Sequence, residues 1–545
     1  MKPTLRRSIL QRFLGLGLQI APDALDLIIN TGEPTAVVDR IIAARIDPTA
    51  VPVISRQYVE TLLGGKDNTT SSTGLQETVV VVERRPDEIV SHEAGNYEKP
   101  RTWALDVIQS PTLDAVGSEG TVQDFHALFM DRFNRIRRMF VTRVDTQGAI
   151  RIEDAVARKK FARRASLMGR RDRRAEKPPA TKIIGMVRNK SVSRSRNIIV
   201  ELEDPSGTIT CVIPSGRSDI DGQSLVRRGN GLLLDEVVCI SGIIDRDGRL
   251  IADDVIYPDI PVAREPGRAE REVYAAFISD IHCGSNEFLE DEFERFVRWM
   301  AGHDVEPEDN KMVPKIEYLF IAGDLCDGVG VYPDQEKDLL IDSVHEQYSL
   351  LAHYLAKLPA RVKIITIPGN HDACRQALPK PPIPEYFADA LYKLGNRILM
   401  LGDPSYVLVE GVTVLLTHGD SLDDLVTQLP GASYKSPAIP MIELLRKRHL
   451  APLYGGKTEL APLSRDWLVI DRIPDIVHFG HAHHNAVDNY RGVQIINSGT
   501  FQAQTDFMRK QGVVPTPGIV TIVNLKTGAP VVRMFYDFSE INGPR

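Results

Sequence analysis

The chain has 545 residues, of which 43% are apolar and 26% are charged, so we expect two to four domains and exclude a mostly disordered protein. No uninterrupted apolar stretch approaches the roughly 20 residues that span a bilayer, which excludes a membrane-embedded protein. The net charge of −7 gives by itself no indication of a nucleic-acid partner.

The first segment, residues 1–63, contains short amphipathic stretches typical of helices, and we predict a small helical N-terminal module. Its early positive charge resembles that of a secretory signal, but Gln11, Arg12 and Gln19 interrupt the apolar residues. The five cysteines are scattered and lack CxxC spacing, which argues against a disulfide framework or a zinc knuckle. A reducing, cytoplasmic location fits this cysteine usage.

The next segments differ sharply in composition. Residues 64–120 are rich in Gly, Ser, Thr and acidic residues, which predicts a flexible linker. Residues 121–180 comprise a helix and a basic linker, whose residues 158–174 hold nine Lys or Arg and one Asp. This basic block is either a phosphate-contacting segment or a solvated linker. The helix carries one apolar stripe at helical spacing, which favours a packing or partner-docking face: Val122, Phe125, Phe129, Phe133, Ile136 and Phe140.

Residues 181–262 change to five short β-rich runs separated by turns such as DPSG and DRDG. Five strands in so short a segment predict a small β-barrel of the OB type, a fold that binds single strands or partner proteins. Few aromatic residues lie in these runs. A structural or partner-binding role is therefore favoured over base stacking.

From residue 271 to the C-terminus, residue 545, five apolar β-rich runs end in polar residues of the kind that bind metals. The runs are VYAAFISD, IEYLFIAGD, KIITIPGNHD, VTVLLTHGD and DIVHFGHAH. Helical stretches separate them, which predicts an α/β domain whose strand ends converge. A single His at a strand end is most often structural, but five independent strands that end alike indicate one site. The polar residues at these ends are Asp280, His282, Asp324, Asn370, His418, His481 and His483.

Asp, Asn and His side chains without a thiolate favour a hard or borderline divalent ion. Manganese is the first choice, with magnesium, zinc or iron as alternatives. Seven ligand side chains are too many for one tetrahedral ion. They suit two divalent metal ions a few ångströms apart, which is an arrangement that hydrolyses phosphoesters.

The motifs DIH, GDLCD, GNHD, THGD and GHAH, in this order, resemble those of the calcineurin-like metallophosphoesterases, including the Mre11 nucleases. The resemblance implies an α/β sandwich in which Asp280, His282, Asp324 and His483 hold the first metal and Asp324 bridges to the second. Asn370, His418 and His481 would complete the second site. His371 resembles the catalytic histidine of the family, and we expect Asp372 to orient it. Asp327 and Asp420 either support the ligands or cap turns.

The expected domain order, a barrel directly before the phosphoesterase domain, resembles that of the B subunits of replicative polymerases. Because every metal ligand is kept, the chain is most similar to the small subunit of archaeal family D DNA polymerases. The stretches HDACRQALPKPPIP, PGASYKSP and LLRKRHLAPLYG agree with this resemblance, which covers roughly residues 180 to 545. It implies a proofreading 3′–5′ exonuclease that releases nucleoside 5′-monophosphates and works together with a large catalytic subunit. The alternatives are a non-catalytic scaffold subunit and a metallophosphatase that acts on another phosphoester.

Several basic residues near the motifs are candidate phosphate contacts for the primer 3′ end or a single DNA strand. The alternative is that they are basic residues on an exposed helix. Three cysteines beside the motifs, Cys283, Cys326 and Cys374, are assigned packing roles. The candidate DNA contacts are Arg375, Arg446, Lys447, Arg448 and His449.

Overall fold

The computed structural model describes residues 103–157, 180–218 and 224–537, together with short pieces between residues 9 and 59. The chain forms two compact units, Met1–Asn96 and Tyr97–Arg545. The basic block at residues 158–174 and most of the predicted linker, residues 64–102, lie outside the described residues.

The described residues of the first unit include the helices α2 (Pro22–Ile29) and α3 (Pro34–Ala43). Leu25, Ile28, Val38 and Ile41 are buried, so each helix contributes an apolar face to a small core. Both helices lie within the segment predicted as a helical module. A parallel pair of two-residue strands, β1 (Gln19–Ile20) and β2 (Val53–Ile54), was not predicted, because so short a strand has no periodicity to detect.

The second unit contains a closed five-stranded barrel with the strand order β4-β5-β6-β8-β7. Its interior is filled by aliphatic side chains such as Val200, Leu202, Ile240 and Leu250. Helix α7 (Leu225–Asn230) lies between the third and fourth strands in the sequence. The predicted small β-barrel is confirmed, with strands β4 (Thr181–Val192), β5 (Ile198–Asp204), β6 (Gly207–Ile213), β7 (Val237–Ile244) and β8 (Leu250–Ile256).

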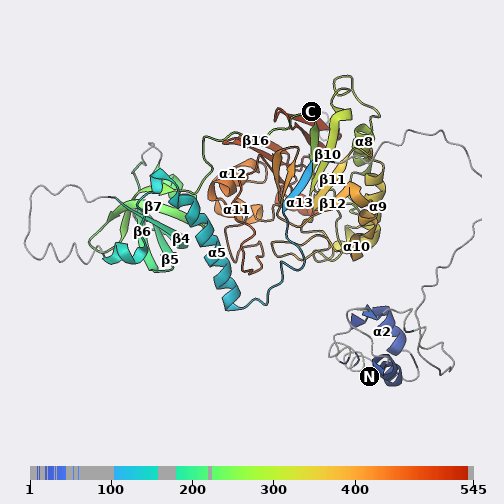
Figure 1. Cartoon of the computed structure of the whole chain (residues 1–545), viewed down its shortest axis with the longest axis horizontal. Coiled ribbons are helices and arrows are strands. Elements are labelled where there is room, and N and C mark those ends of the chain that lie inside the picture. Colours follow the sequence, from blue (N-terminus) through green and yellow to red (C-terminus); the bar gives the residue numbers. More distant parts are fainter. Residues whose placement is uncertain are drawn as a thin grey trace, which may run out of the picture. The chain divides into compact units, whose positions relative to one another are not determined.

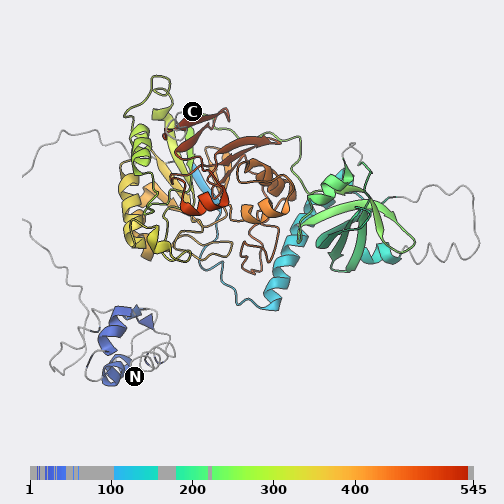
Figure 2. The ribbon, with the colours of Figure 1, turned by 180° about the vertical axis from the view of Figure 1, so that it is seen from behind.

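Helix α5 (Val122–Val141) lies against this barrel (Figures 1 and 2). It begins at a capping box, in which the Thr121 side chain accepts from the backbone N–H of Asp124 and the Asp124 side chain accepts from that of Thr121. Phe133, Ile136 and Phe140 pack on barrel residues. The apolar stripe is therefore a packing face over its C-terminal half. The short 3₁₀ helix η1 (Val144–Thr146) follows α5.

The remainder of this unit is built on two six-stranded sheets. One has the order β12-β11-β10-β9-β18-β19, and β9 to β12 within it are parallel. The other has the order β16-β17-β15-β14-β13-β3, and its β14, β15 and β17 are parallel. Phe277 and Phe320 of one sheet and Val414 and Ile496 of the other share one buried cluster, so the sheets pack face to face.

The strands of the first sheet are β9 (Tyr274–Ile278), β10 (Ile316–Ala322), β11 (Lys363–Ile367), β12 (Ile398–Met400), β18 (Ile519–Asn524) and β19 (Pro530–Met534). The strands of the second are β3 (Leu105–Gln109), β13 (Ser405–Val409), β14 (Val412–Leu416), β15 (Ile476–Phe479), β16 (Ala486–Tyr490) and β17 (Val493–Asn497).

Helices cover the outer face of each sheet, which gives the predicted α/β sandwich (Figure 1). The first sheet is covered by α8 (Glu290–Met300), α9 (Val344–Ala356) and α10 (Glu385–Tyr392), and the second by α11 (Leu422–Gln428) and α12 (Ala438–Lys447). The remaining short elements are α13 (Asp506–Gln511), η2 (Val313–Lys315), η3 (Gln335–Lys337) and η4 (Gly395–Arg397). None of the described helices is both long and apolar enough to cross a membrane.

Strand β3 corrects the predicted organisation. It lies within the segment predicted as linker, yet it pairs antiparallel with β13 at the edge of the second sheet. The linker prediction is therefore wrong for this part, and the sandwich is not confined to residues 271–545. The barrel is inserted in the sequence between β3 and the other strands of the sandwich. The sequence LDVIQ gives no clear signal because this edge strand is half exposed and lacks alternation.

Candidate metal centre

All seven predicted ligand residues lie just after the C-terminal ends of parallel strands. Strand β9 is followed by Asp280 and His282, β10 by Asp324 and β11 by Asn370, all in the first sheet. In the second sheet, β14 is followed by His418, and β15 by His481 and His483. Because neighbouring parallel strands end on the same side of a sheet, both sheets deliver their polar residues to one place.

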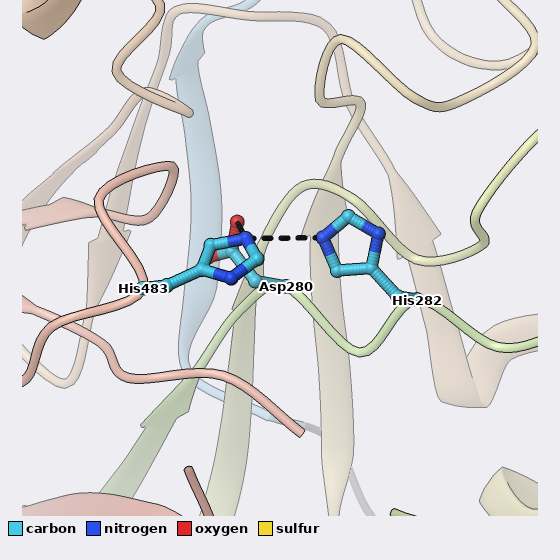
Figure 3. Close-up of side chains that lie close together, drawn as sticks. All are labelled: Asp280, His282 and His483. Carbon is cyan, nitrogen blue, oxygen red and sulfur yellow. Dashed lines mark hydrogen bonds and ion pairs between the residues drawn. The ribbon is translucent and has the colours of Figure 1, made fainter. Parts of the chain in front are cut away.

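One group of side chains gathers Asp280, His282 and His483, which point toward one another (Figure 3). The Nε2 atoms of His282 and His483 are 3.1 Å apart, and His483 Nε2 lies 3.3 Å from Asp280 Oδ1. His282 Nε2 is also 3.6 Å from Asp324 Oδ2. All four residues are buried. The structure thus brings together the four residues predicted to hold the first metal.

A second group lies beside the first and shares Asp324. His418 Nε2 is 2.9 Å from Asn370 Oδ1 and 3.3 Å from Asp324 Oδ2. His481 Nδ1 is 3.1 Å from the same Asn370 oxygen. The three residues predicted for the second metal are thus brought together, and Asp324 contacts both groups as a bridging carboxylate would.

The electrostatics of the two groups fit divalent cations. Burial lowers the pKa of His282, but its hydrogen bond to Asp327 and the nearby carboxylates outweigh burial and raise the pKa to about 9. For His418, burial is likewise outweighed, chiefly by Asp324, and the pKa rises to about 10. For His483, by contrast, burial outweighs the nearby carboxylates and lowers the pKa. The carboxylates around His282 and His418 thus provide negative charge that bound cations would neutralise. The donor set, carboxylate, amide and imidazole, also suits such ions.

The backbone at the ligands is strained. Left-handed φ angles are uncommon for residues other than glycine and cost free energy, so they persist where the surrounding structure enforces them. A cluster of such residues at one place points to function. Five of the seven predicted ligands have positive φ: Asp280 (52°), His282 (51°), Asp324 (48°), His481 (65°) and His483 (52°).

The second ring nitrogen of three ligand histidines is held by an oxygen atom. His282 Nδ1 lies 2.9 Å from Asp327 Oδ1, His418 Nδ1 lies 2.7 Å from the Ala322 carbonyl, and His481 Nε2 lies 3.0 Å from Asp423 Oδ1. Such partners orient metal-binding imidazoles and fix their tautomers. Asp327 was a candidate support in the sequence. Asp423 was missed because it lies in the first turn of α11, where an acidic residue is ordinary.

His371 lies at the edge of the two groups, with 18% of its side chain exposed. Its Nδ1 is 2.9 Å from the Asp327 carbonyl oxygen, and its backbone N–H donates to Asp324 Oδ1 at 2.8 Å. Its ring contacts that of His282 edge-on, with 4.7 Å between centroids. His371 is therefore fixed beside the predicted bridging carboxylate.

Asp372 does not orient His371, so that prediction is wrong. The Asp372 carboxylate accepts from the backbone N–H groups of Gly369, Leu325 and Cys326 and from the hydroxyl of Tyr348. It is buried, and burial together with the Asp324 charge raises its pKa. Asp372 holds the loop that carries Asn370 and His371, and the Asp327 carbonyl orients the ring.

Asp420 lies beside His418 and His481 of the second group, and its predicted supporting role stays a prediction. Asp420 Oδ2 is 2.6 Å from the ammonium of Lys380, and both side chains are largely buried. Asp403, also buried, accepts a hydrogen bond from the backbone N–H of His418. Burial raises the pKa of Asp403 to about 6. This buried charge group was not visible in the sequence.

Most of the predicted DNA contacts are structural residues instead. Lys447 is fully buried and pairs with Glu236 of the barrel segment at 2.7 Å. Arg448 and His449 are buried too, the first donating to the Ile470 carbonyl and the second pairing with Asp466. A buried charge that is held by internal partners cannot reach a phosphate, so the prediction is wrong for these three residues.

Arg375 and Arg446 differ from them in burial. The Arg375 guanidinium is half-buried and donates to the backbone carbonyls of Val116, Ala377 and Pro379, which commits it to its own loop. Arg446 keeps 33% of its side chain exposed beside Glu443, and its phosphate contact stays a prediction.

Comparison with solved structures gave weak overall matches. An archaeal phosphodiesterase is 13% identical with a TM-score of 0.25 and covers 48% of this chain and 99% of its own. A zinc complex of Vps29 from Entamoeba histolytica is 14% identical with a TM-score of 0.23 and covers 48% of this chain and 97% of its own.

Comparison with protein sequences identifies the family of the chain. Residues 275–487 match the family of the B subunits of DNA polymerases alpha and epsilon. The DNA polymerase II small subunit of Archaeoglobus fulgidus is 36% identical over 97% of this chain and 98% of its own length. That of Halobacterium salinarum is 34% identical over 98% and 99%, and that of Methanocaldococcus jannaschii is 42% identical over 74% and 64%. The chain therefore belongs to the family of archaeal DNA polymerase II small subunits.

Proposed function

We propose that this chain is the 3′–5′ proofreading exonuclease subunit of a replicative DNA polymerase. In this role it would hydrolyse the terminal phosphodiester of a primer strand and release a nucleoside 5′-monophosphate. The observation that carries the proposal is the convergence of Asp280, His282, Asp324, Asn370, His418, His481 and His483 from five strand ends. A subunit that served as a scaffold alone would not need this strained and mutually supported set of ligand atoms.

When bound, two divalent metal ions would supply Lewis-acid stabilisation of charge on the phosphoryl oxygens and lower the pKa of the attacking water. Asp280, His282, Asp324 and His483 would hold one ion, and Asp324, Asn370, His418 and His481 the other. Manganese stays our first choice of metal, because the donors are oxygen and imidazole nitrogen.

His371 is assigned to the leaving group. Because its Nδ1 is engaged by the Asp327 carbonyl, Nε2 is the atom that would face the scissile phosphate. Water adds to phosphorus, the bond from phosphorus to the 3′-oxygen breaks, and His371 Nε2 gives a proton to that oxygen. The products are a nucleoside 5′-monophosphate and a strand shortened by one nucleotide with a free 3′-hydroxyl.

The partner that we propose is a large subunit that carries the polymerase active site, since the relatives are named as small subunits of a DNA polymerase. DNA would enter as a primer 3′ end or a single strand. An intracellular, nucleoid-associated location goes with this proposal.

The test is digestion of a 3′-mismatched primer-template by the full chain with manganese, compared with the variants His371→Ala and Asp324→Asn. We expect stepwise loss of single 5′-mononucleotides from the 3′ end and at least about a 100-fold decrease for His371→Ala, which is the scale of a general acid. His303→Ala, at an exposed histidine, is the matched control and should keep full activity.

Two outcomes would favour the alternative functions. If the chain shows no nuclease activity either alone or with the large subunit added, the non-catalytic scaffold role is favoured. If it hydrolyses small phosphomonoesters faster than DNA, it is a metallophosphatase. Manganese binding is measured by calorimetry in the same preparations. Binding without activity would indicate an inactive metal site, and no binding would indicate that the site is absent.

A further inference from the structure

We propose that Tyr332 is the stacking platform for the base of the penultimate nucleotide, which is the nucleotide that keeps the new 3′-hydroxyl after cleavage. The inference rests on the proposed exonuclease function and adds a substrate-positioning residue to it. Tyr332 belongs to none of the motifs that predict the site, and it comes from the loop that follows β10.

The residues around the metal centre differ in their exposure to solvent. Asp280 and His418 have fully buried side chains, whereas His371 and His481 are 18% and 16% exposed. His371 and His481 are therefore among the residues that a DNA strand can contact when it reaches the predicted metals.

Tyr332 lies beside His371. The two rings meet edge-on, with 6.2 Å between their centroids. Tyr332 is 37% exposed, although it lies beside a site whose ligand residues are mostly buried. Exposed rings of this kind stack on nucleobases, and stacking on single strands tolerates any base. That tolerance suits an enzyme that has to remove whichever nucleotide was misincorporated.

The ring is held in place by the loop that carries it. The Tyr332 hydroxyl donates to Asp338 Oδ2 at 3.0 Å. Buried Gln335 accepts from the backbone N–H of Val331 at 2.8 Å and donates to the Asp327 carbonyl at 2.8 Å. That carbonyl also holds His371, so one short network fixes both rings. A fixed aromatic ring binds a base with little loss of conformational entropy.

The position of Tyr332 selects which base it contacts. His371 is assigned to the leaving 3′-oxygen, so the nucleoside that carries this oxygen lies on the His371 side of the scissile phosphate. Tyr332 stands on the same side. The base beside it is therefore the penultimate one, and the excised nucleotide lies beyond the metals.

The test uses the full chain, with the large subunit if activity requires it, and three single strands. One strand is unmodified, one is abasic at the 3′-terminal nucleotide and one is abasic at the penultimate nucleotide. For Tyr332→Ala we expect kcat/KM to fall by about 5- to 150-fold on the first two strands, the range for loss of one stacked base. On the strand abasic at the penultimate position, wild type and variant should be equal.

Two control variants separate stacking from structure. Tyr332→Phe removes the bond to Asp338 but keeps the ring, and should retain most of the activity on the unmodified strand. Tyr386→Ala removes a tyrosine that is 75% exposed and contacts His345 and Phe387, and should change nothing. An equal loss for Tyr332→Ala on all three strands, or a loss that depends on the terminal base, would overturn the assignment.

A binding measurement keeps the inference separate from the proposed activity. A strand with 2-aminopurine at the penultimate position, and a methylene group in place of the scissile 3′-oxygen, cannot be cleaved. Its fluorescence should be quenched by the wild-type chain and by Tyr332→Phe, but not by Tyr332→Ala. Quenching without any nuclease activity would contradict the proposed function and uphold the stacking site, whereas activity without quenching would do the reverse.

Discussion

Asp423 binds the far side of His481, at the outer rim of the metal centre. Its Oδ1 is 3.0 Å from His481 Nε2 and accepts from the Tyr434 hydroxyl at 2.7 Å. Burial acts to raise the pKa of Asp423, but the His481 charge and these hydrogen bonds outweigh it and hold the pKa well below its usual value. The carboxylate therefore stays ionised and keeps the Nδ1 atom of His481 aimed at Asn370.

Replacing Asp423 with alanine should weaken manganese binding at the second site by about 10- to 100-fold, because an unsupported imidazole is a poorer and less oriented ligand. Isothermal titration of the chelator-treated chain measures this loss. Asp304→Asn is the control, since Asp304 is exposed and bonded only to Arg298 among the described residues, and asparagine tolerates its left-handed φ of 53°. Unchanged affinity in Asp423→Ala would show that Asp423 serves the fold alone.

His478 makes the unfolding free energy of the chain depend on pH. It is fully buried in β15, where its Nε2 is 2.7 Å from Ser498 Oγ, and burial lowers its pKa to about 3. The unfolded chain, with a usual histidine pKa near 6.5, takes up a proton first as the pH falls. The contribution of His478 is thus fully present above pH ~6.5 and decreases toward pH ~3.

Between pH 7 and pH 4.5, the wild-type chain should lose about 2 kcal/mol more unfolding free energy than His478→Gln does. Urea unfolding in EDTA at both pH values gives the comparison and leaves metal binding out of it. His353→Gln, at an exposed position on α9, should behave as the wild type. Parallel losses in His478→Gln and the wild type would refute this expectation.

The site residues differ in how well a sequence predicts them. The convergence of the seven predicted ligands and His371 was predictable because each follows a strong apolar run, and strand ends converge whatever their distance along the chain. Asp423 and Lys380 lie on a helix and in a loop without such a mark. Lys447 and Arg448 were misplaced because their burial depends on neighbouring segments, which the helix sequence itself does not reveal.

The C-terminal end of α12 is one of the elements that join the sandwich to the barrel. The Lys447 ammonium donates to the Gly231 carbonyl at 2.7 Å, pairs with Glu236 and lies 4.7 Å from the centre of the Tyr257 ring. Next to it, Arg446 accepts a hydrogen bond at its carbonyl from the backbone N–H of Asp259. The barrel is thus fixed to the sandwich through buried polar contacts.

Lys447→Met should destabilise the chain by about 3–5 kcal/mol, because it leaves the Glu236 charge buried without a cation. The double variant Lys447→Met with Glu236→Gln should recover much of this loss, because the uncompensated charge is gone. Chemical unfolding of the two variants measures the difference. Lys435→Met, at an exposed lysine, is the control. Equal losses in the single and double variants would contradict the charge argument.

Strands of the sandwich were predictable where they are buried and missed where they are not. All seven residues of β10 are buried, and all of them except Glu317 are apolar. Strand β3, by contrast, has two exposed residues among its five and forms only because β13 offers an unpaired edge. No local pattern in the sequence carries that information.

On the scale of the whole molecule, the metal centre joins the two sheets. The residues around it come from β9, β10 and β11 of one sheet and from β14 and β15 of the other. Ions bound there would cross-link the two halves of the sandwich, since Asp324 and His418 reach it from opposite sheets and lie 3.3 Å apart.

Manganese should therefore raise the thermal midpoint of the entire sandwich in one transition. At 100 times the Kd, each site would stabilise the folded chain by about 2.7 kcal/mol. Calorimetry of the chelator-treated chain, with and without manganese, measures the shift. Asp324→Asn should lose most of it and Asp304→Asn none of it. A metal-induced shift that survived in Asp324→Asn would place the stabilising ions elsewhere.

The insertion of the barrel between β3 and the rest of the sandwich imposes an order on folding during synthesis. Strand β3 leaves the ribosome early, but its partner β13 follows roughly 300 residues later, which at ribosomal speeds of about 5–20 residues per second is a delay of about 15–60 seconds. The barrel strands pair among themselves and are complete well before that. During this delay α5 can already pack on the barrel, whereas β3 stays unpaired until β13 has been synthesised.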